Sequence, residues 1–108
     1  MEDNIQEMYQ RARKAFEVVR FWHQEKVDEM VQAVAWELMK DDVRHKLGHM
    51  AVDESNIGNA EDKVNKIKNK TLGTLWDMRD AKTCGLVEED TSLGIRKYAK
   101  PIGVIANV

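Results

Sequence analysis

Apolar residues recur at spacings of three and four through the first four-fifths of the chain, and charged residues fill most of the positions between them. This spacing gathers the apolar residues on one side of a helix. The pattern therefore predicts four helices within residues 1–80, with a break at 21–24 and further breaks near 41 and 57. The apolar stripes of the four predicted helices are, in chain order, Ile5, Met8, Ala12, Ala15, Phe16 and Val19; Val27, Met30, Val31, Val34 and Leu38; Val43, Leu47, Met50 and Ala51; and Val64, Ile67, Thr71, Leu75 and Met78.

Residues that favour helix ends mark the later boundaries. Asp41 and Asp42 are suited to the N-cap of the third helix, because a carboxylate accepts hydrogen bonds from unpaired backbone N–H groups. Residues 56–58 read Asn-Ile-Gly, and both Asn and Gly tolerate the positive φ at which helices end. Asn59, followed three residues later by Asp62, predicts a capping box at the start of the fourth helix.

After residue 80 the pattern changes to short, β-prone runs. Residues 84–88 and 95–99 predict two strands, and the sequence E-D-T-S-L-G between them has the chemistry of a turn. Residues 102–108 are apolar almost throughout, which is typical of a parallel strand buried on both faces. Pro101, which has no N–H to donate, separates this run from the preceding strand.

The predicted fold class is α/β, with a helical region over 1–80 and a strand region over 81–108. A parallel strand needs neighbours that are reached through crossover connections. The sequence supplies none, so we expect the neighbours of the final strand to lie outside this chain. Trp36 lies off the apolar stripe of the second helix, and we expect it to contact another helix or protein outside this chain.

Composition and charge restrict the function classes. The formal net charge is −2 and the pI about 5.9, which disfavours nucleic acid as a partner. The single cysteine excludes an intrachain disulfide and favours a reducing compartment; the expected location is the cytoplasm. No apolar run approaches the ~20 residues of a membrane span, and the N-terminal residues lack the pattern of a secretory signal. A lysine-rich run interleaved with acidic residues is best explained as a solvated helix face; it comprises Lys63, Lys66, Lys68 and Lys70.

The residues with reactive or ligating side chains predict no site. Cys84 has no histidine near it in the sequence to act as a base, so we interpret it as a small apolar strand residue. His45 and His49 share one side of the third helix at a spacing that can bind a metal. The sequence H-K-L-G-H lacks the glutamate of a zinc protease, and a solvated face is the favoured interpretation. The chain also lacks G-x-G-x-x-G and Walker A sequences. We therefore assign no catalytic, cofactor-binding or metal-binding residue.

Two segments resemble a known enzyme family. Residues 50–70, M-A-V-D-E-S-N-I-G-N-A-E-D-K-V-N-K-I-K-N-K, resemble the N-terminal helical region of CoA-acylating aldehyde dehydrogenases. The family pattern there is E-T-G-x-G-x-x-E-D-K followed by a helix rich in lysine and asparagine. This chain departs from the pattern at Ser55 and Asn56. Residues 87–108, which contain P-I-G-V-I, resemble the strand pair that leads into the cofactor domain of these enzymes.

The resemblance implies an aldehyde-dehydrogenase-like fold, with a short β-hairpin and a strand entering a Rossmann-like, cofactor-binding domain that is absent from this chain. It implies an NAD(P)-dependent oxidoreductase that converts a short aldehyde and CoA to acyl-CoA. Acetaldehyde, propionaldehyde and sulfoacetaldehyde fit about equally well. In the family the catalytic cysteine and the residues that hold the cofactor lie downstream of the matching region. We therefore expect the chain alone to be inactive and to bind neither NAD or NADP nor CoA.

The resemblance also implies partners, namely the remainder of the dehydrogenase and a second copy in a homo-oligomer. We expect neither nucleic acid nor a membrane as a partner. An alternative is a free-standing helical interaction or assembly module derived from such an enzyme. An unpaired apolar strand is an aggregation liability, so a soluble monomer at high concentration would favour this alternative.

Overall fold

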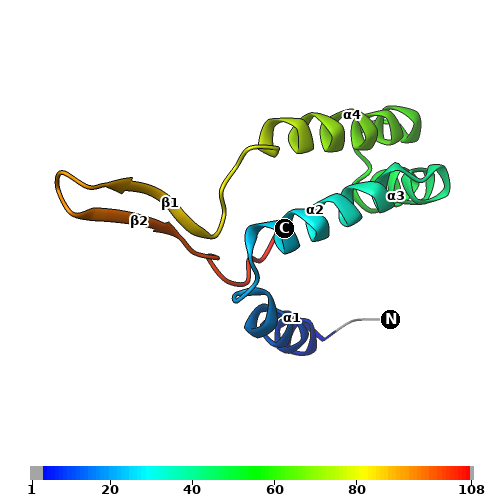
Figure 1. Cartoon of the computed structure of the whole chain (residues 1–108). Coiled ribbons are helices and arrows are strands. Elements are labelled where there is room, and N and C mark those ends of the chain that lie inside the picture. Colours follow the sequence, from blue (N-terminus) through cyan, green and yellow to red (C-terminus); the bar gives the residue numbers. More distant parts are fainter. Residues whose placement is uncertain (1–3, 108) are drawn as a thin grey trace. The chain divides into compact units, whose positions relative to one another are not determined.

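The computed structural model describes residues 4–107 and contains four helices followed by an antiparallel hairpin (Figure 1). This order confirms the four predicted helices and the two strands that follow them. Two compact units are present: a hairpin unit, described over 4–27 and 82–107, and a helical unit over 28–81. The elements are α1 (Ile5–Val19), α2 (Gln24–Met39), α3 (Asp41–Ser55), α4 (Ala60–Met78), β1 (Gly85–Asp90) and β2 (Ile95–Ala99).

Helix α1 is stabilised mainly by local interactions. Its N-cap is Asn4, whose Oδ1 accepts a hydrogen bond from the backbone N–H of Gln6 at 2.9 Å. Glu17 pairs with Arg13 at 3.5 Å and with Arg20 at 3.3 Å, although exposed pairs of this kind contribute little to stability. No residue of the helix is buried. The amphipathic pattern is therefore present, but its apolar side has little covering it.

The contact between α3 and α4 is the close helix packing of the helical unit. Gly48 on α3 is buried against α4. A Cβ atom at position 48 would lie 2.6 Å from Val64 Cγ2 and 3.2 Å from the carbonyl oxygen of Ala60. Val64 is itself buried. The two helices reach this separation because position 48 has no side chain.

The predicted N-cap of α3 is wrong. Lys40 occupies the N-cap with extended backbone and makes no side-chain cap, because an ammonium group cannot accept a hydrogen bond. Asp41 and Asp42 are already helical residues of the first turn, where their charge suits the positive end of the helix dipole. The Asp41 carboxylate pairs instead with Arg44, one turn further along.

The predicted boundary between α3 and α4 is confirmed. Asn56 ends α3 in the left-handed conformation, with φ 54°. Asn59 caps α4, and its Oδ1 accepts from the backbone N–H of Asp62 at 2.9 Å. The amide group of Asn59 also donates to the Asp62 carboxylate at 2.6 Å. This reciprocal pair takes the place of the capping box that the sequence predicts.

The buried side of α2 differs in part from the predicted stripe. Ala35, which the stripe omits, is 7 % exposed, whereas Val34 is 58 % exposed. Val31 and Leu38 are half-buried, as predicted. Ala35 continues the spacing of four from Val31, so the buried line follows the period of the helix rather than the size of the side chains.

The hairpin has a bulge that the sequence does not predict. Gly85 pairs with Ala99 and Glu88 with Lys97, and the register shifts between Leu86 and Glu88. Such a bulge leaves one residue of a strand without an opposite partner and increases the local twist. The strand β1 begins after Cys84, so the prediction of a strand over 84–88 is displaced by one or two residues.

The apolar run over 102–107 forms no strand in the described structure, so the predicted final strand is not observed. Ile102 is 91 % exposed and Ile105 is 72 % exposed. The physical reason is that a strand exists only through hydrogen bonds to a neighbouring strand. The described hairpin offers no parallel neighbour, because its two strands pair only with each other. Residue 108 lies outside the described residues.

Gln24 fixes the segment that precedes the hairpin. Its Oε1 accepts from the backbone N–H of Thr83 at 2.7 Å and from that of Cys84 at 3.2 Å. Its Nε2 donates to the Thr83 hydroxyl at 3.0 Å. The side-chain amide thus bonds both as donor and as acceptor, as a peptide group of a neighbouring strand would. The start of α2 is thereby tied to residues about sixty positions away.

Acidification is expected to loosen the hairpin turn through Asp90. Its Oδ1 accepts from the Ser92 hydroxyl at 2.6 Å and from the N–H groups of Ser92 and Leu93 at 3.0 and 3.1 Å. These bonds, that of the Ser92 hydroxyl above all, lower the pKa of the Asp90 carboxyl. The pKa of Asp90 is lower in the folded state than in the unfolded state. This stabilisation is therefore fully present at pH values above the ordinary carboxyl pKa, and it is lost as the pH falls through the pKa of the folded state.

The measurement is amide exchange at Ser92 and Leu93 by NMR over a descending pH series, corrected for intrinsic rates. Protection at these two amides should decline as Asp90 becomes protonated. Asp90→Asn is the matched control, since its amide oxygen still accepts but does not titrate in this range. An identical pH response in the two proteins would show that the carboxylate is not responsible.

Candidate functional site

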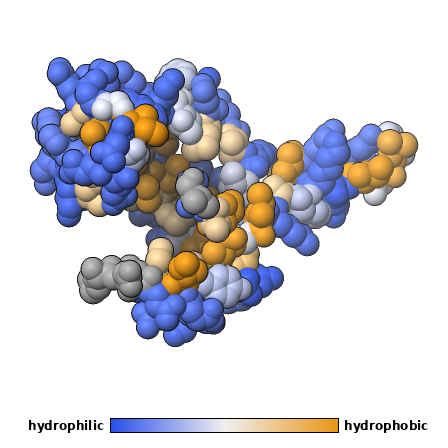
Figure 2. Space-filling view, turned by 180° about the vertical axis from the view of Figure 1, so that it is seen from behind, coloured by the Kyte–Doolittle hydropathy of each residue, from blue (hydrophilic) through white to orange (hydrophobic). Residues whose placement is uncertain are grey.

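Within residues 4–107 no large side chain is fully buried, and the buried apolar residues are Ala35 and Val64. Each unit instead leaves apolar side chains at its surface, drawn orange in Figure 2. Contiguous exposed apolar surface on a soluble protein marks an interaction site. The large apolar side chains most exposed in the helical unit include Val34, Trp36, Ile57, Leu72, Trp76 and Met78.

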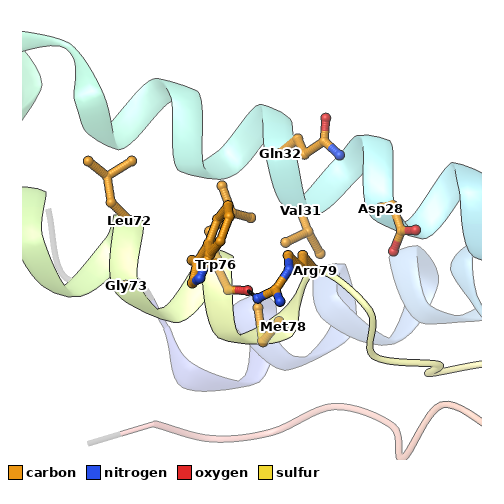
Figure 3. Close-up of a pocket in the computed structure, with 9 residues that line it drawn as sticks. Asp28, Val31, Gln32, Leu72, Gly73, Trp76, Met78 and Arg79 are labelled. Carbon is orange, nitrogen blue, oxygen red and sulfur yellow. Dashed lines mark hydrogen bonds between the residues drawn. The ribbon is translucent and has the colours of Figure 1, made fainter.

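An apolar groove of about 800 Å³ lies between α2 and α4 of the helical unit. Leu72 and Trp76 extend from α4 towards α2, and Val31 extends from α2 towards α4 (Figure 3). These side chains lie on the facing sides of the two helices because residues separated by three or four positions share one face. The groove is lined by Asp28, Val31, Gln32, Leu72, Gly73, Leu75, Trp76, Met78 and Arg79.

Trp76 and Arg79 form one end of this groove. The Arg79 guanidinium lies 4.3 Å from the centroid of the Trp76 ring, which is a cation–π contact. Arg79 also donates to the backbone carbonyl of Trp76 at 2.9 Å. The indole is nevertheless 66 % exposed. The arrangement holds a large aromatic surface in a fixed orientation, as at the anchors of protein interfaces.

The sequence did not identify this groove. Met78 belongs to the predicted apolar stripe of the fourth helix and Trp76 does not, and the structure leaves both exposed. Trp36 is 71 % exposed, in agreement with its position off the predicted stripe. No local pattern signals the groove, because it depends on how α2 and α4 lie against each other.

A second hollow, of about 530 Å³, lies between α3 and α4 and contains both helical histidines. His45 Nδ1 lies 2.7 Å from the backbone carbonyl oxygen of Asp41. Among residues 4–107 no group of three or more His, Cys, Asp or Glu side chains is placed to hold a metal ion. The lining residues are Arg44, His45, His49, Ala60, Glu61, Val64, Asn65 and Lys68.

Cys84 is half-buried beside Gln24, with its Sγ 3.8 Å from Gln24 Oε1. A side-chain amide is not a base, so this contact provides no means of activating the thiol. In the lysine-rich run, Lys63 is half-buried and Lys66, Lys68 and Lys70 are exposed. Neither feature gathers into a catalytic arrangement. None of the helices within residues 4–107 has the length and apolar character that crossing a bilayer requires.

Comparison with known proteins identifies the family of enzymes that the chain resembles. It is 46 % identical over 95 residues to a sulfoacetaldehyde dehydrogenase of Acholeplasma, and 41 % identical over 104 residues to the acylating sulfoacetaldehyde dehydrogenase of Bilophila wadsworthia. It is also 37 % identical over 101 residues to the bifunctional aldehyde-alcohol dehydrogenase AdhE of Escherichia coli K12. These matches cover 88 %, 96 % and 94 % of the chain.

The matches cover only part of each relative. The chain spans 20 % and 22 % of the two sulfoacetaldehyde dehydrogenases and 11 % of AdhE. No protein-family model matches the chain. No solved structure matches it. The chain is homologous to an N-terminal portion of CoA-acylating aldehyde dehydrogenases, and the family prediction is confirmed.

Proposed function

We propose that the chain is the N-terminal part of an NAD(P)-dependent, CoA-acylating aldehyde dehydrogenase and is not itself catalytic. The carrying observation is 41 % identity over 104 residues to an acylating dehydrogenase of which the chain spans about a fifth. The whole enzyme converts a short aldehyde, CoA and NAD⁺ to acyl-CoA, NADH and a proton. The cofactors, NAD or NADP and CoA, are bound by the remainder of the protein.

In this proposal the chain contributes structure rather than chemistry. The exposed groove between α2 and α4 and the exposed run over 102–107 pack against the remainder of the dehydrogenase or a second copy. Burial of apolar area supplies the free energy of such contacts, at roughly 25 cal/mol per Å². The location of the enzyme is the cytoplasm. Nucleic acid and membranes are not partners.

The test compares the activity of the isolated chain with that of the intact gene product. The purified 108-residue chain is assayed for NADH formation with CoA, NAD⁺ and either acetaldehyde or sulfoacetaldehyde. It should give no turnover alone, and the intact product of its own gene should give turnover with at least one aldehyde. Steady NADH formation by the isolated chain would contradict the proposal.

A second candidate is a free-standing helical module, which the self-contained contact of α3 with α4 favours. The two functions are separated by the intact mass of the protein made from its own locus. A mass several times 12.5 kDa supports the dehydrogenase. A mass of 12.5 kDa supports the module.

A further inference from the structure

We propose that His45 and His49 form a two-imidazole binding site for a late first-row transition-metal ion, and that the bound ion stabilises α3. This inference goes beyond the dehydrogenase assignment and does not depend on it. The two residues are one helical turn apart, so their side chains lie on the same side of α3. Both line the hollow between α3 and α4, which is open to solvent and large enough for an ion with coordinated water.

The hydrogen bond of His45 prepares one ring nitrogen as a ligand. Nδ1 lies 2.7 Å from the carbonyl oxygen of Asp41. A carbonyl oxygen only accepts, so the proton of the neutral ring lies on Nδ1 and the lone pair lies on Nε2. Histidine ligands in metal sites commonly donate their second N–H to a backbone carbonyl, which fixes the tautomer and the orientation of the ring.

The ligand chemistry and the ligand count determine the kind of ion. The charges in the hollow do not select it, because Arg44 and Lys68 line the hollow as cations and Glu61 lines it as an anion. Only two protein ligands are available, so water completes the coordination. Imidazole nitrogens favour copper, nickel and zinc over the hard ions magnesium and calcium. The expected order of affinity among divalent ions therefore follows Cu²⁺ above Ni²⁺ above Co²⁺.

The position of the site couples metal binding to stability. His45 and His49 bracket Gly48, the residue whose missing side chain allows α4 to approach. Glycine is a poor helix former, because it loses more backbone freedom than other residues on folding. A chelate across this turn requires helical backbone at 45–49. An ion that binds the folded form in preference to the unfolded form raises the unfolding temperature.

The experiment titrates the full chain with CuCl₂ and with NiCl₂ by calorimetry and records thermal unfolding with and without Ni²⁺. His49→Ala and His45→Ala should each weaken binding by on the order of 100-fold, because the second ligand acts at a high effective concentration. Each should also remove the rise in unfolding temperature. His23→Ala is the matched control, since His23 lies before α2 and is exposed; this variant should bind as the unaltered chain does.

A second measurement uses the unaltered chain and so does not depend on any variant folding. Substoichiometric Cu²⁺ should broaden the imidazole NMR signals of His45 and His49 before those of His23. Equal broadening of all three histidines would overturn the proposal. Unchanged affinity in His49→Ala, or binding of Mg²⁺ as tight as that of Ni²⁺, would overturn it as well.

Discussion

Replacing both Leu72 and Trp76 with glutamate is expected to abolish assembly of the intact dehydrogenase while leaving the isolated chain folded. Both side chains are largely exposed in the groove between α2 and α4. Burying a large apolar side chain contributes about 1.5–3 kcal/mol, and burying a carboxylate without a partner, as at position 72, costs considerably more. The free-energy cost of the two substitutions together should therefore exceed the free energy that holds an ordinary packing interface within one protein.

The measurements are soluble yield, mass by light scattering and activity of the intact gene product, with circular dichroism of the isolated chain. Binding of a hydrophobic dye to the isolated chain should fall in the double variant, because the groove is then polar. Asn69→Glu supplies the matched control on the same helix, since Asn69 is exposed and lies outside the groove. Normal assembly and activity of the double variant would show that the groove faces solvent in the intact enzyme.

Gly48→Ala is expected to destabilise the contact of α3 with α4, whereas Gly73→Ala should stabilise α4. A Cβ at position 48 would lie 2.6 Å from Val64 Cγ2 and 3.1 Å from the backbone nitrogen of Val64, so the helices must separate. Overpacking typically costs about 1–3 kcal/mol, and alanine recovers up to about 1 kcal/mol of helix propensity. Nothing lies within 4 Å of a Cβ at position 73, so only the propensity gain applies there.

Urea unfolding followed by circular dichroism compares the two variants with the unaltered chain. Both variants replace a helical glycine with alanine, so both gain the same helix propensity. A difference in sign between their stability changes therefore reports the close approach of the helices at position 48. We expect the unfolding midpoint to fall for Gly48→Ala and to rise for Gly73→Ala. A rise for both variants would mean that α3 and α4 do not pack at this separation.

The limits of the helices were predictable because they depend on local chemistry. Asn56 adopts positive φ and Asn59 caps α4, as their side chains predict. The N-cap of α3 was misassigned because Asp41 is equally suitable in the first turn, and only the backbone distinguishes the two positions. Hairpin limits were close to those observed, but the bulge near residue 87 depends on the pairing of two strands, which no single segment encodes.

Features that depend on packing between segments were harder to predict. Ala35 and Gly48 are buried because neighbouring helices approach them, and small residues carry little signal in a hydrophobic pattern. The groove was missed for a related reason, since Trp76 lies off the predicted stripe of its helix and the groove exists only through the placement of α4 beside α2. The final apolar run was predicted as a strand from composition, but strand formation requires a partner.

The bonding of Gln24 has a consequence for chemical ageing. Slow deamidation would convert this side chain to glutamate. Its oxygens would still accept from the N–H groups of Thr83 and Cys84, and the Thr83 hydroxyl could rotate to donate where it now accepts. The new charge would lie in the first turn of α2, where the helix dipole favours an anion. The hydrogen bonds that tie residue 24 to the backbone of Thr83 and Cys84 would therefore persist after this covalent change.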